Sequence, residues 1–209
     1  MKIAVVCANG KAGRLIVKEA LDRGLDVTAI ARGENRTVAG KYIRKDLFDL
    51  AAADVAAYDV VVDAFGAWAE AELPNHTRSL MHLCDILSGT QTRLLVVGGA
   101  GSLYINPEHS AVVSDGPDFP AMFLPLATAQ GKALEELRKR SDVRWTFVSP
   151  AGDFQAEAER TGAYILAGEE LTLNDRGESI ISYADYAIAM VDEIVSGSHI
   201  RQRISVVRK

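Results

Sequence analysis

Short runs of consecutive apolar residues, most of them β-branched, recur along the chain. They cover residues 3–6, 27–31, 60–64, 94–97 and 145–148; a weaker strand is expected around residues 42–43 and a final strand over residues 203–207. Apolar runs of this length, without polar alternation, are typical of strands buried on both faces of a parallel sheet. The pattern therefore predicts a sheet of mostly parallel strands.

Helical periodicity fills the intervals between these runs. In the first interval, small or apolar residues recur at helical spacing from Gly13 to Leu21, and Gly24 supplies a stop. Further helices are predicted over residues 76–88, 132–140 and 184–195. This alternation predicts an α/β fold, a doubly wound parallel sheet of the Rossmann type with right-handed crossovers.

Two segments interrupt the alternation. Residues 98–121 contain several glycines and prolines and little periodicity, as a functional loop or a disordered segment does. Residues 152–182 hold short β-like pieces at 164–166 and 179–181, and are interpreted as a small C-terminal lobe on the substrate side. Residues 1–209 are expected to form one domain.

The composition narrows the class of protein. The chain is 48% hydrophobic and 24% charged, which is close to the average for soluble globular proteins. Its net charge of −5 argues against a nucleic-acid partner, because such a surface is basic. Neither a signal peptide nor a membrane-spanning run is evident, and Cys7 and Cys84 lack metal-ligand spacing. We expect a cytoplasmic protein without a membrane partner or a metal site.

A glycine-rich turn, Cys7-Ala8-Asn9-Gly10-Lys11-Ala12-Gly13, follows the first predicted strand. Gly10 would let the backbone approach a pyrophosphate, and Gly13 would let the helix pack closely on the strand. The free amides at the helix N-terminus would then face the phosphates. The turn predicts a dinucleotide site, and a tight turn without a ligand is the alternative.

The second predicted strand ends at Arg32. At this point an acidic residue reads the ribose 2′-hydroxyl of NAD, whereas an arginine accommodates the 2′-phosphate of NADP. A guanidinium suits phosphate because it offers several donors in a planar fork. Arg32, with Asn35 and Arg36 close behind, favours NADP, while Glu34 leaves NAD open.

Together with later segments, these features resemble the atypical short-chain dehydrogenase/reductases. The resemblance is to the NADH-flavin reductase group, which is related to NmrA-like and biliverdin-reductase-B-like NAD(P)-binding proteins. It covers nearly the whole chain, and it rests on residues 8–13, 28–32, 45–49, 94–103, 145–150 and 179–187. The order and spacing of these pieces carry it more than any single piece does.

The resemblance implies a cofactor-binding role for each matching position. These positions are Gly10, Lys11, Ala12 and Gly13 at the pyrophosphate, Arg32 at the 2′-phosphate, Asp46 and Leu47 at the adenine, Ala64, Phe65 and Gly66 along the cofactor, Gly98 and Gly99 near the nicotinamide ribose, and Pro150 and Ala151 at the nicotinamide ring.

Two positions depart from the family pattern. Cys7 stands where the first glycine of the turn usually lies, which requires a negative φ there. The Tyr-x-x-x-Lys pair of carbonyl-reducing members corresponds to Thr128 and Lys132, so a lysine that could bond the ribose remains and the phenol is lost. A threonine hydroxyl is too weak an acid to donate a proton near neutral pH, which argues against ordinary alcohol or ketone oxidoreduction.

Hydride transfer to FMN or another dissociable flavin, or to a quinone-like acceptor, tolerates the missing phenol. The cofactor carries the reaction, the acceptor ring can take its proton from solvent, and stacking of the two rings does most of the work. His109 and Lys132 are the candidate catalytic groups. Aromatic residues that follow strand ends are candidates for the acceptor site: Trp68, Tyr104, Phe123 and Phe154.

An NAD(P)H-dependent reductase is therefore the main hypothesis. A sensor that binds NAD(P) without turnover and reports to a partner, as NmrA-like relatives do, agrees equally well with the missing tyrosine. An exposed apolar patch around Trp68 or the long connection would favour the sensor, and a cleft wide enough for a three-ring acceptor would favour the reductase. A sugar-nucleotide epimerase or dehydratase is the weakest candidate, since such enzymes usually retain the tyrosine and are longer.

Overall fold

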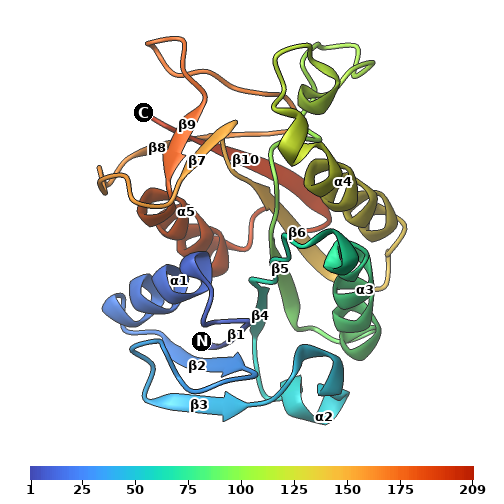
Figure 1. The fold of residues 1–209 in the computed structure, drawn as a ribbon. Coiled ribbons are helices and arrows are strands. Elements are labelled where there is room, and N and C mark those ends of the chain that lie inside the picture. Colours follow the sequence, from blue (N-terminus) through green and yellow to red (C-terminus); the bar gives the residue numbers. More distant parts are fainter.

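The computed structural model describes residues 1–209, and an eight-stranded sheet runs through it (Figure 1). The strand order is β3-β2-β1-β4-β5-β6-β10-β8, and only β8 runs antiparallel to its neighbour. The strands are β1 (Lys2–Val6), β2 (Asp26–Ala31), β3 (Lys41–Arg44), β4 (Val60–Asp63), β5 (Arg93–Val97), β6 (Arg144–Ser149), β8 (Tyr164–Ala167) and β10 (Gln202–Arg208). The doubly wound parallel sheet predicted from the apolar runs is confirmed.

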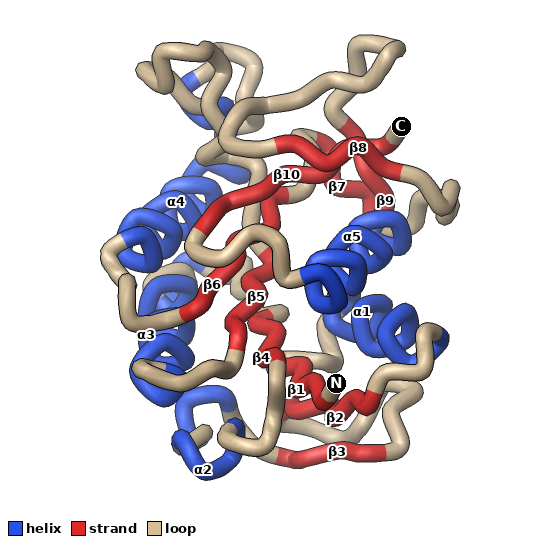
Figure 2. Tube along the Cα trace, turned by 180° about the vertical axis from the view of Figure 1, so that it is seen from behind, coloured by secondary structure: helices blue, strands red, loops and turns tan.

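Helices cover both faces of the sheet, so the molecule has three layers (Figure 2). One face carries α1 (Lys11–Asp22) and α5 (Tyr183–Ser196), which pack against each other. The other face carries α3 (Asn75–Leu87) and α4 (Leu124–Arg138), with the short helix α2 (Ala52–Val55) near the β3 edge. Single 3₁₀ turns are η1 (Leu47–Asp49), η2 (Glu70–Glu72), η3 (Val113–Asp115) and η4 (Ala121–Phe123).

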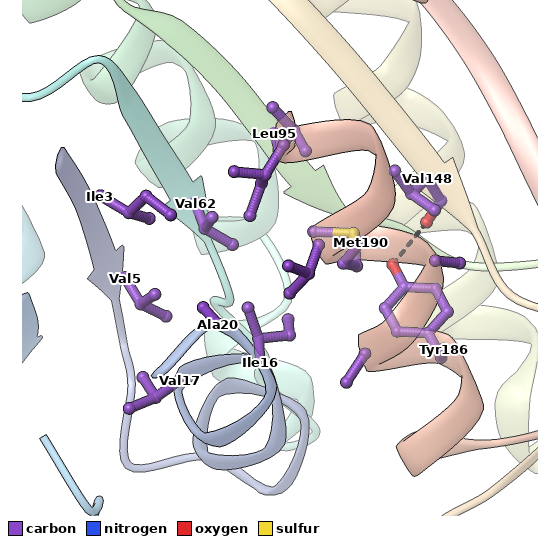
Figure 3. Packing of buried hydrophobic residues seen from close by; sticks show 14 of the residues in the cluster. Ile3, Val5, Ile16, Val17, Ala20, Val62, Leu95, Val148, Tyr186 and Met190 are labelled. Atoms are coloured by element: carbon purple, nitrogen blue, oxygen red, sulfur yellow. Dashed lines mark hydrogen bonds between the residues drawn. The ribbon is translucent and has the colours of Figure 1, made fainter. Parts of the chain in front are cut away.

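Alternate residues of each central strand enter two separate hydrophobic clusters. Val5 of β1 and Val62 of β4 face α1 and α5, whereas Val61, the neighbour of Val62, faces α3 and α4. Figure 3 shows the first cluster, in which Ile16 and Met190 approach the strand side chains. Because successive side chains of a strand point to opposite faces, burial of both faces requires the unbroken apolar runs of the sequence.

Helix α4 begins at Leu124, eight residues before the start predicted at residue 132. Pro125 lies in its first turn, where the missing amide hydrogen has no intrahelical partner and proline is tolerated. The residues of the first two turns are exposed or half-buried, with Ala127 the only buried one. An apolar stripe therefore does not mark this part of the helix.

The segment interpreted as a substrate-side lobe divides into two parts. Strand β8 extends the main sheet by pairing with β10, while β7 (Asp153–Gln155) and β9 (Ile180–Ser182) form a separate two-stranded parallel sheet. Ser182 caps helix α5, because its hydroxyl accepts from the backbone N–H of Asp185 at 3.0 Å.

The connection from β5 to α4 contains only the turns η3 and η4 as regular structure, in agreement with the irregular segment predicted over residues 98–121. Backbone hydrogen bonds join Tyr104 to Glu169 and Leu171. Buried Arg203 of β10 donates to the carbonyl oxygens of Ser102 and Glu169. The connection is thus fastened to the segment that follows β8.

None of the helices has the length and apolar character that a membrane span requires.

Candidate cofactor and acceptor cleft

A continuous cleft of about 1460 Å³ runs along the carboxyl ends of the strands. The chain segments that follow β1 through β6 all contribute to its walls, together with the β5–α4 connection and the start of α5. Ligands of open α/β sheets bind at this edge, because successive strands deliver their loops to it.

The turn after β1 presents uncapped backbone amides to the cleft. Gly10 is the N-cap residue of α1, no side chain caps the helix, and its first turn lacks acidic residues. Gly10, Lys11 and Ala12 line the cleft. Unpaired amides and the positive end of the helix dipole form an anion site, so this turn fits the pyrophosphate of a dinucleotide. Gly13 does not line the cleft but lies against Ala8 of the turn.

Cys7 adopts a positive φ of 58°, so the negative φ expected from the sequence is wrong. The chain reverses sharply here: the amide of Gly10 donates to the Cys7 carbonyl, and the amide of Ala8 donates to Ile30 of β2. These bonds hold a non-glycine residue in the left-handed region that glycine usually takes. Burial, reinforced by the nearby carboxylate of Asp63, raises the pKa of the Cys7 thiol to about 12, which keeps it neutral.

The end of the cleft beside β2 is basic. Arg32, with 81% of its side chain exposed, lies 3.7 Å from the Asp46 carboxylate, and Arg36 also lines the cleft. Asn9 ties this region to the glycine turn, since its Oδ1 accepts from the amide of Arg36 and its Nδ2 donates to the carbonyl of Glu34. The Glu34 side chain is not part of the lining. Two guanidinium groups, without a paired glutamate, therefore face this end.

Asp46 and Leu47 form the next part of the wall. One carboxylate oxygen of Asp46 accepts from the amide of Phe48 at 3.0 Å and caps η1. The carboxylate thus has a fixed position beside Arg32 and Leu47 at the surface of the cleft.

The opposite end of the cleft is built from the ends of β4, β5 and β6. The residues that the resemblance places along the cofactor (Ala64, Phe65 and Gly66) and around its nicotinamide and ribose (Gly98, Gly99, Pro150 and Ala151) all line this end, which is called the nicotinamide end below. Gly98 has no room for a side chain, because a Cβ there would overlap the Phe147 ring. The backbone therefore forms much of this wall.

Aromatic side chains surround this nicotinamide end. Trp68 and Phe123 meet edge to face with ring centroids 6.3 Å apart, and both line the cleft. Phe154 stacks on Tyr183, the first residue of α5, at 3.8 Å, and both also line it. Three of the four predicted aromatic residues thus line the cleft, together with Tyr183.

The fourth aromatic residue, Tyr104, and both predicted catalytic residues lie outside the cleft lining, which corrects their expected placement. Tyr104 stacks on His109 at 4.0 Å, and His109 Nε2 lies 2.9 Å from Glu170. This cluster fastens the long connection to residue 170. Lys132 is exposed on α4.

The placement of Lys132 follows from the register of α4. The helix turns Leu126 and Gln130 toward the cleft, a pair with the same four-residue spacing as Thr128 and Lys132 but two residues earlier. A shift of two residues rotates a side chain by about 200° around the helix axis, so Thr128 and Lys132 point away from the cleft. The Thr128 hydroxyl donates to the Leu124 carbonyl of its own helix.

The sequence did not single out Gln130, which lines the cleft, or Asp63, which lies beside Gln130 in a small cavity next to the cleft. Asp63, the last residue of β4, is 3% exposed, and one of its carboxylate oxygens accepts from the amide of Phe65 at 3.0 Å. Burial raises its pKa to about 6, although the Phe65 bond opposes the shift. A carboxylate that ends an apolar run was the available signal for Asp63.

Comparison with known proteins agrees with this geometry. The chain is 42% identical to the protein YwnB of Bacillus subtilis (strain 168), over 99% of its own length and 98% of that protein's. The crystal structure of SP1627, "a putative NADH-flavin reductase" from Streptococcus pneumoniae TIGR4, superposes with a TM-score of 0.98 at 53% identity, with full coverage of both chains. A Lactobacillus casei protein superposes with a TM-score of 0.89 at 28% identity, over 100% of this chain and 99% of that one.

A family profile matches most of the chain. Residues 7–194, from the glycine turn to helix α5, match the profile of a family described as NAD(P)H-binding. The match includes every residue that lines the cleft except Val6. The protein belongs to the NAD(P)H-binding family.

Proposed function

We propose that this protein is an NADPH-dependent oxidoreductase whose acceptor is a flavin or a quinone-like ring that it binds and releases. The observation that carries the proposal is the cleft itself, with arginines at one end and aromatic side chains at the other. A pocket for one drug-sized ligand occupies roughly 300–1,000 Å³. A cleft of about 1460 Å³ therefore has room for a dinucleotide and a second ligand.

The residues divide the binding of the cofactor between them. The α1 amides and Lys11 would hold the pyrophosphate, and Arg32 with Arg36 would hold the 2′-phosphate of NADPH. Gly98 and Gly99 would border the nicotinamide ribose, and Pro150 and Ala151 the nicotinamide ring. Bound NADPH supplies a hydride.

The acceptor is inferred from the walls of the nicotinamide end. Trp68, Phe123 and Phe154 offer apolar faces to a planar ring, and stacking such a ring close to the nicotinamide supplies orientation. Helix α4 presents Leu126 and Gln130 to the cleft, whereas Thr128 and Lys132 are not part of its lining. Neither Leu126 nor Gln130 is an acid, which favours a conjugated ring over a simple ketone. The naming of the similar SP1627 protein agrees with this acceptor class.

The test is NADPH oxidation by the purified protein under anaerobic conditions, with and without FMN, beside a binding titration. Turnover should require the added acceptor and saturate in it, with menadione as a quinone and acetone as a ketone for comparison. Reduction of the ketone at a rate equal to that of FMN would contradict the acceptor class.

A sensor without turnover is the second candidate, and exposed apolar surface at the mouth of the cleft favours it. Trp68 is 69% exposed and contacts Phe123, whose neighbours Met122 and Leu124 are 79% and 44% exposed. Apolar side chains grouped on a surface often mark a protein contact. Tight NADPH binding with no reduction of any flavin or quinone would establish this candidate in place of the reductase.

A further inference from the structure

A second, small cavity adjoins the nicotinamide end of the cleft. It has a volume of about 20 Å³, enough for one water molecule. The cavity and the cleft share Phe65, Val97, Gly98 and Gln130 in their linings, so one thin wall separates them. Its polar side chains come from Asp63, His76 and Gln130.

Asp63 has no cationic partner in this cavity. The lining contains neither lysine nor arginine, and the single hydrogen bond to the carboxyl comes from the Phe65 amide. A buried carboxylate without a counter-ion is costly, so Asp63 keeps its proton to a higher pH than an exposed aspartate does. The arrangement is that of a group that stores a proton next to the cleft.

The other titratable groups around Asp63 are uncharged near neutral pH. Helix α3 contributes His76, whose pKa is lowered by burial, and Cys84, whose pKa burial raises to about 12. The turn after β1 contributes Cys7, a neutral thiol. Helix α4 contributes the uncharged Gln130, and the residues of β5 and β6 in the lining are apolar or glycine. Asp63, with a pKa of about 6, changes charge between pH 5 and 7.

We propose that Asp63 holds the proton that accompanies hydride transfer and passes it to the acceptor through a water in this cavity, with Gln130 orienting that water at the wall of the cleft. The inference deepens the proposed function and rests on it. Asp63 touches neither acceptor nor cofactor, so it acts as a positioning and proton-holding residue.

The proton balance is simple. The acceptor gains two electrons and one hydrogen as hydride, and the negative charge that results on it is neutralised by a proton from the cavity water. That water takes the proton of the Asp63 carboxyl, and the carboxylate recovers one from solvent through the cleft. The net reaction consumes one NADPH and one proton for each acceptor reduced.

The substitution Asp63→Asn distinguishes a proton-holding role of Asp63 from a purely structural one. The bond from the Phe65 amide to Asp63 shapes the turn after β4, and an asparagine carbonyl accepts that bond equally well. Asp63→Asn therefore retains the turn and removes the proton. Asp59→Asn is the matched control, because Asp59 lies just before the same strand and accepts from the Lys2 amide, far from the cavity.

The first experiment needs no turnover. Infrared spectra of the NADP⁺-bound protein between pH 4 and 9 should show a carboxylic-acid C=O band that is lost with a midpoint of about 6. The band should persist in Asp59→Asn and be missing in Asp63→Asn. Its absence from the wild-type protein above pH 5 would overturn the inference.

The second experiment measures kcat for acceptor reduction against pH. The wild-type rate should fall as the pH rises above 6, by up to about tenfold per unit, while Asp63→Asn should be flat and about 100-fold slower at pH 5.5. Gln130→Leu should lower kcat at every pH and retain the infrared midpoint. An unchanged pH profile in Asp63→Asn would refute the proton role and leave the reductase intact, whereas a wild-type protein that reduces no acceptor would refute both.

Discussion

Gly13 of α1 lies so close to Ala8 of the preceding turn that a Cβ at position 13 would be 2.9 Å from both the Cα and the carbonyl oxygen of Ala8. These are backbone atoms, which cannot move aside as a flexible side chain would. The start of α1 therefore lies so close to Ala8 that only glycine fits at position 13. The positions of the Gly10, Lys11 and Ala12 amides at the cleft depend on this close packing.

The first prediction tests this packing. Gly13→Ala should weaken NADPH and NADH binding alike, by at least about tenfold, because the helix N-terminus must move away from the pyrophosphate. Gly13→Val should abolish binding of both. Fluorescence titration measures the effect, with circular dichroism to establish folding and Gly40→Ala, where a Cβ meets nothing within 4 Å, as the control. Normal affinity in a folded Gly13→Val variant would contradict the role of the turn.

Arg32 and Arg36 should select NADPH over NADH. Removing either guanidinium deletes charge-assisted hydrogen bonds to the 2′-phosphate, each worth about 1.5–3 kcal/mol. Arg32→Ala is therefore expected to raise the NADPH dissociation constant about 10- to 100-fold and to leave that of NADH nearly unchanged. Isothermal titration with both cofactors decides the matter, and an equal loss for both would exclude 2′-phosphate recognition by Arg32.

Trp68 should act on the acceptor and not on the cofactor. Its indole lines the cleft and meets Phe123 edge to face, so Trp68→Ala removes one apolar wall of the acceptor site. We expect the KM for FMN to rise about tenfold, in line with roughly 1.4 kcal/mol of aromatic contact, with unchanged NADPH affinity. Leu173→Ala, exposed and outside the cleft lining, serves as the control. A change in NADPH affinity without a change in the KM for FMN would show that Trp68 contacts the cofactor and not the acceptor.

Asp185 should make the stability of the protein depend on pH in the acid range. Burial opposes its ionisation, but hydrogen bonds from Gly162, Thr161 and Ser182 outweigh burial and lower its pKa. The carboxylate joins the start of α5 to the segment before β8 through the amides of Thr161 and Gly162. A lowered pKa means that the stabilisation is complete above the ordinary aspartate pKa of about 3.9 and is lost as the pH falls further.

Urea unfolding of Asp185→Asn measures this contribution. The variant should be about 2 kcal/mol less stable than the wild type at pH 7, and the difference should shrink below pH 4. Asp175→Asn, at an exposed position, should match the wild type throughout. A difference between wild type and Asp185→Asn that stays constant down to pH 2 would show that packing, and not charge, is responsible.

Local pattern was sufficient to predict the sheet, most of the helices and the glycine turn. A strand buried on both faces needs a continuous apolar run wherever it pairs, so Val60, Val61 and Val62 indicate β4 without knowledge of their neighbours. Gly10, Gly13 and Arg32 lie at fixed places relative to the first two strands. The topology then brings them to one edge, because the carboxyl ends of parallel strands meet there.

Contacts between elements that are distant in sequence decided the rotation of α4, the backbone conformation of Cys7 and the pKa of Asp63. The rotation of α4 turns Gln130 inward and Lys132 outward, and it depends on how α4 packs on α3 and β6, which no periodicity in residues 124–131 reveals. The positive φ of Cys7 is imposed by hydrogen bonds that include one from Ala8 to Ile30 on the next strand. The raised pKa of Asp63 follows from its burial, to which α3 and α4 contribute by shielding it from bulk solvent. The sequence by itself determined which elements form and at which edge they meet, since those are local and topological properties. The tertiary structure decided which side chains face the cleft and in which charge state, because helix rotation and desolvation arise only when the layers pack together.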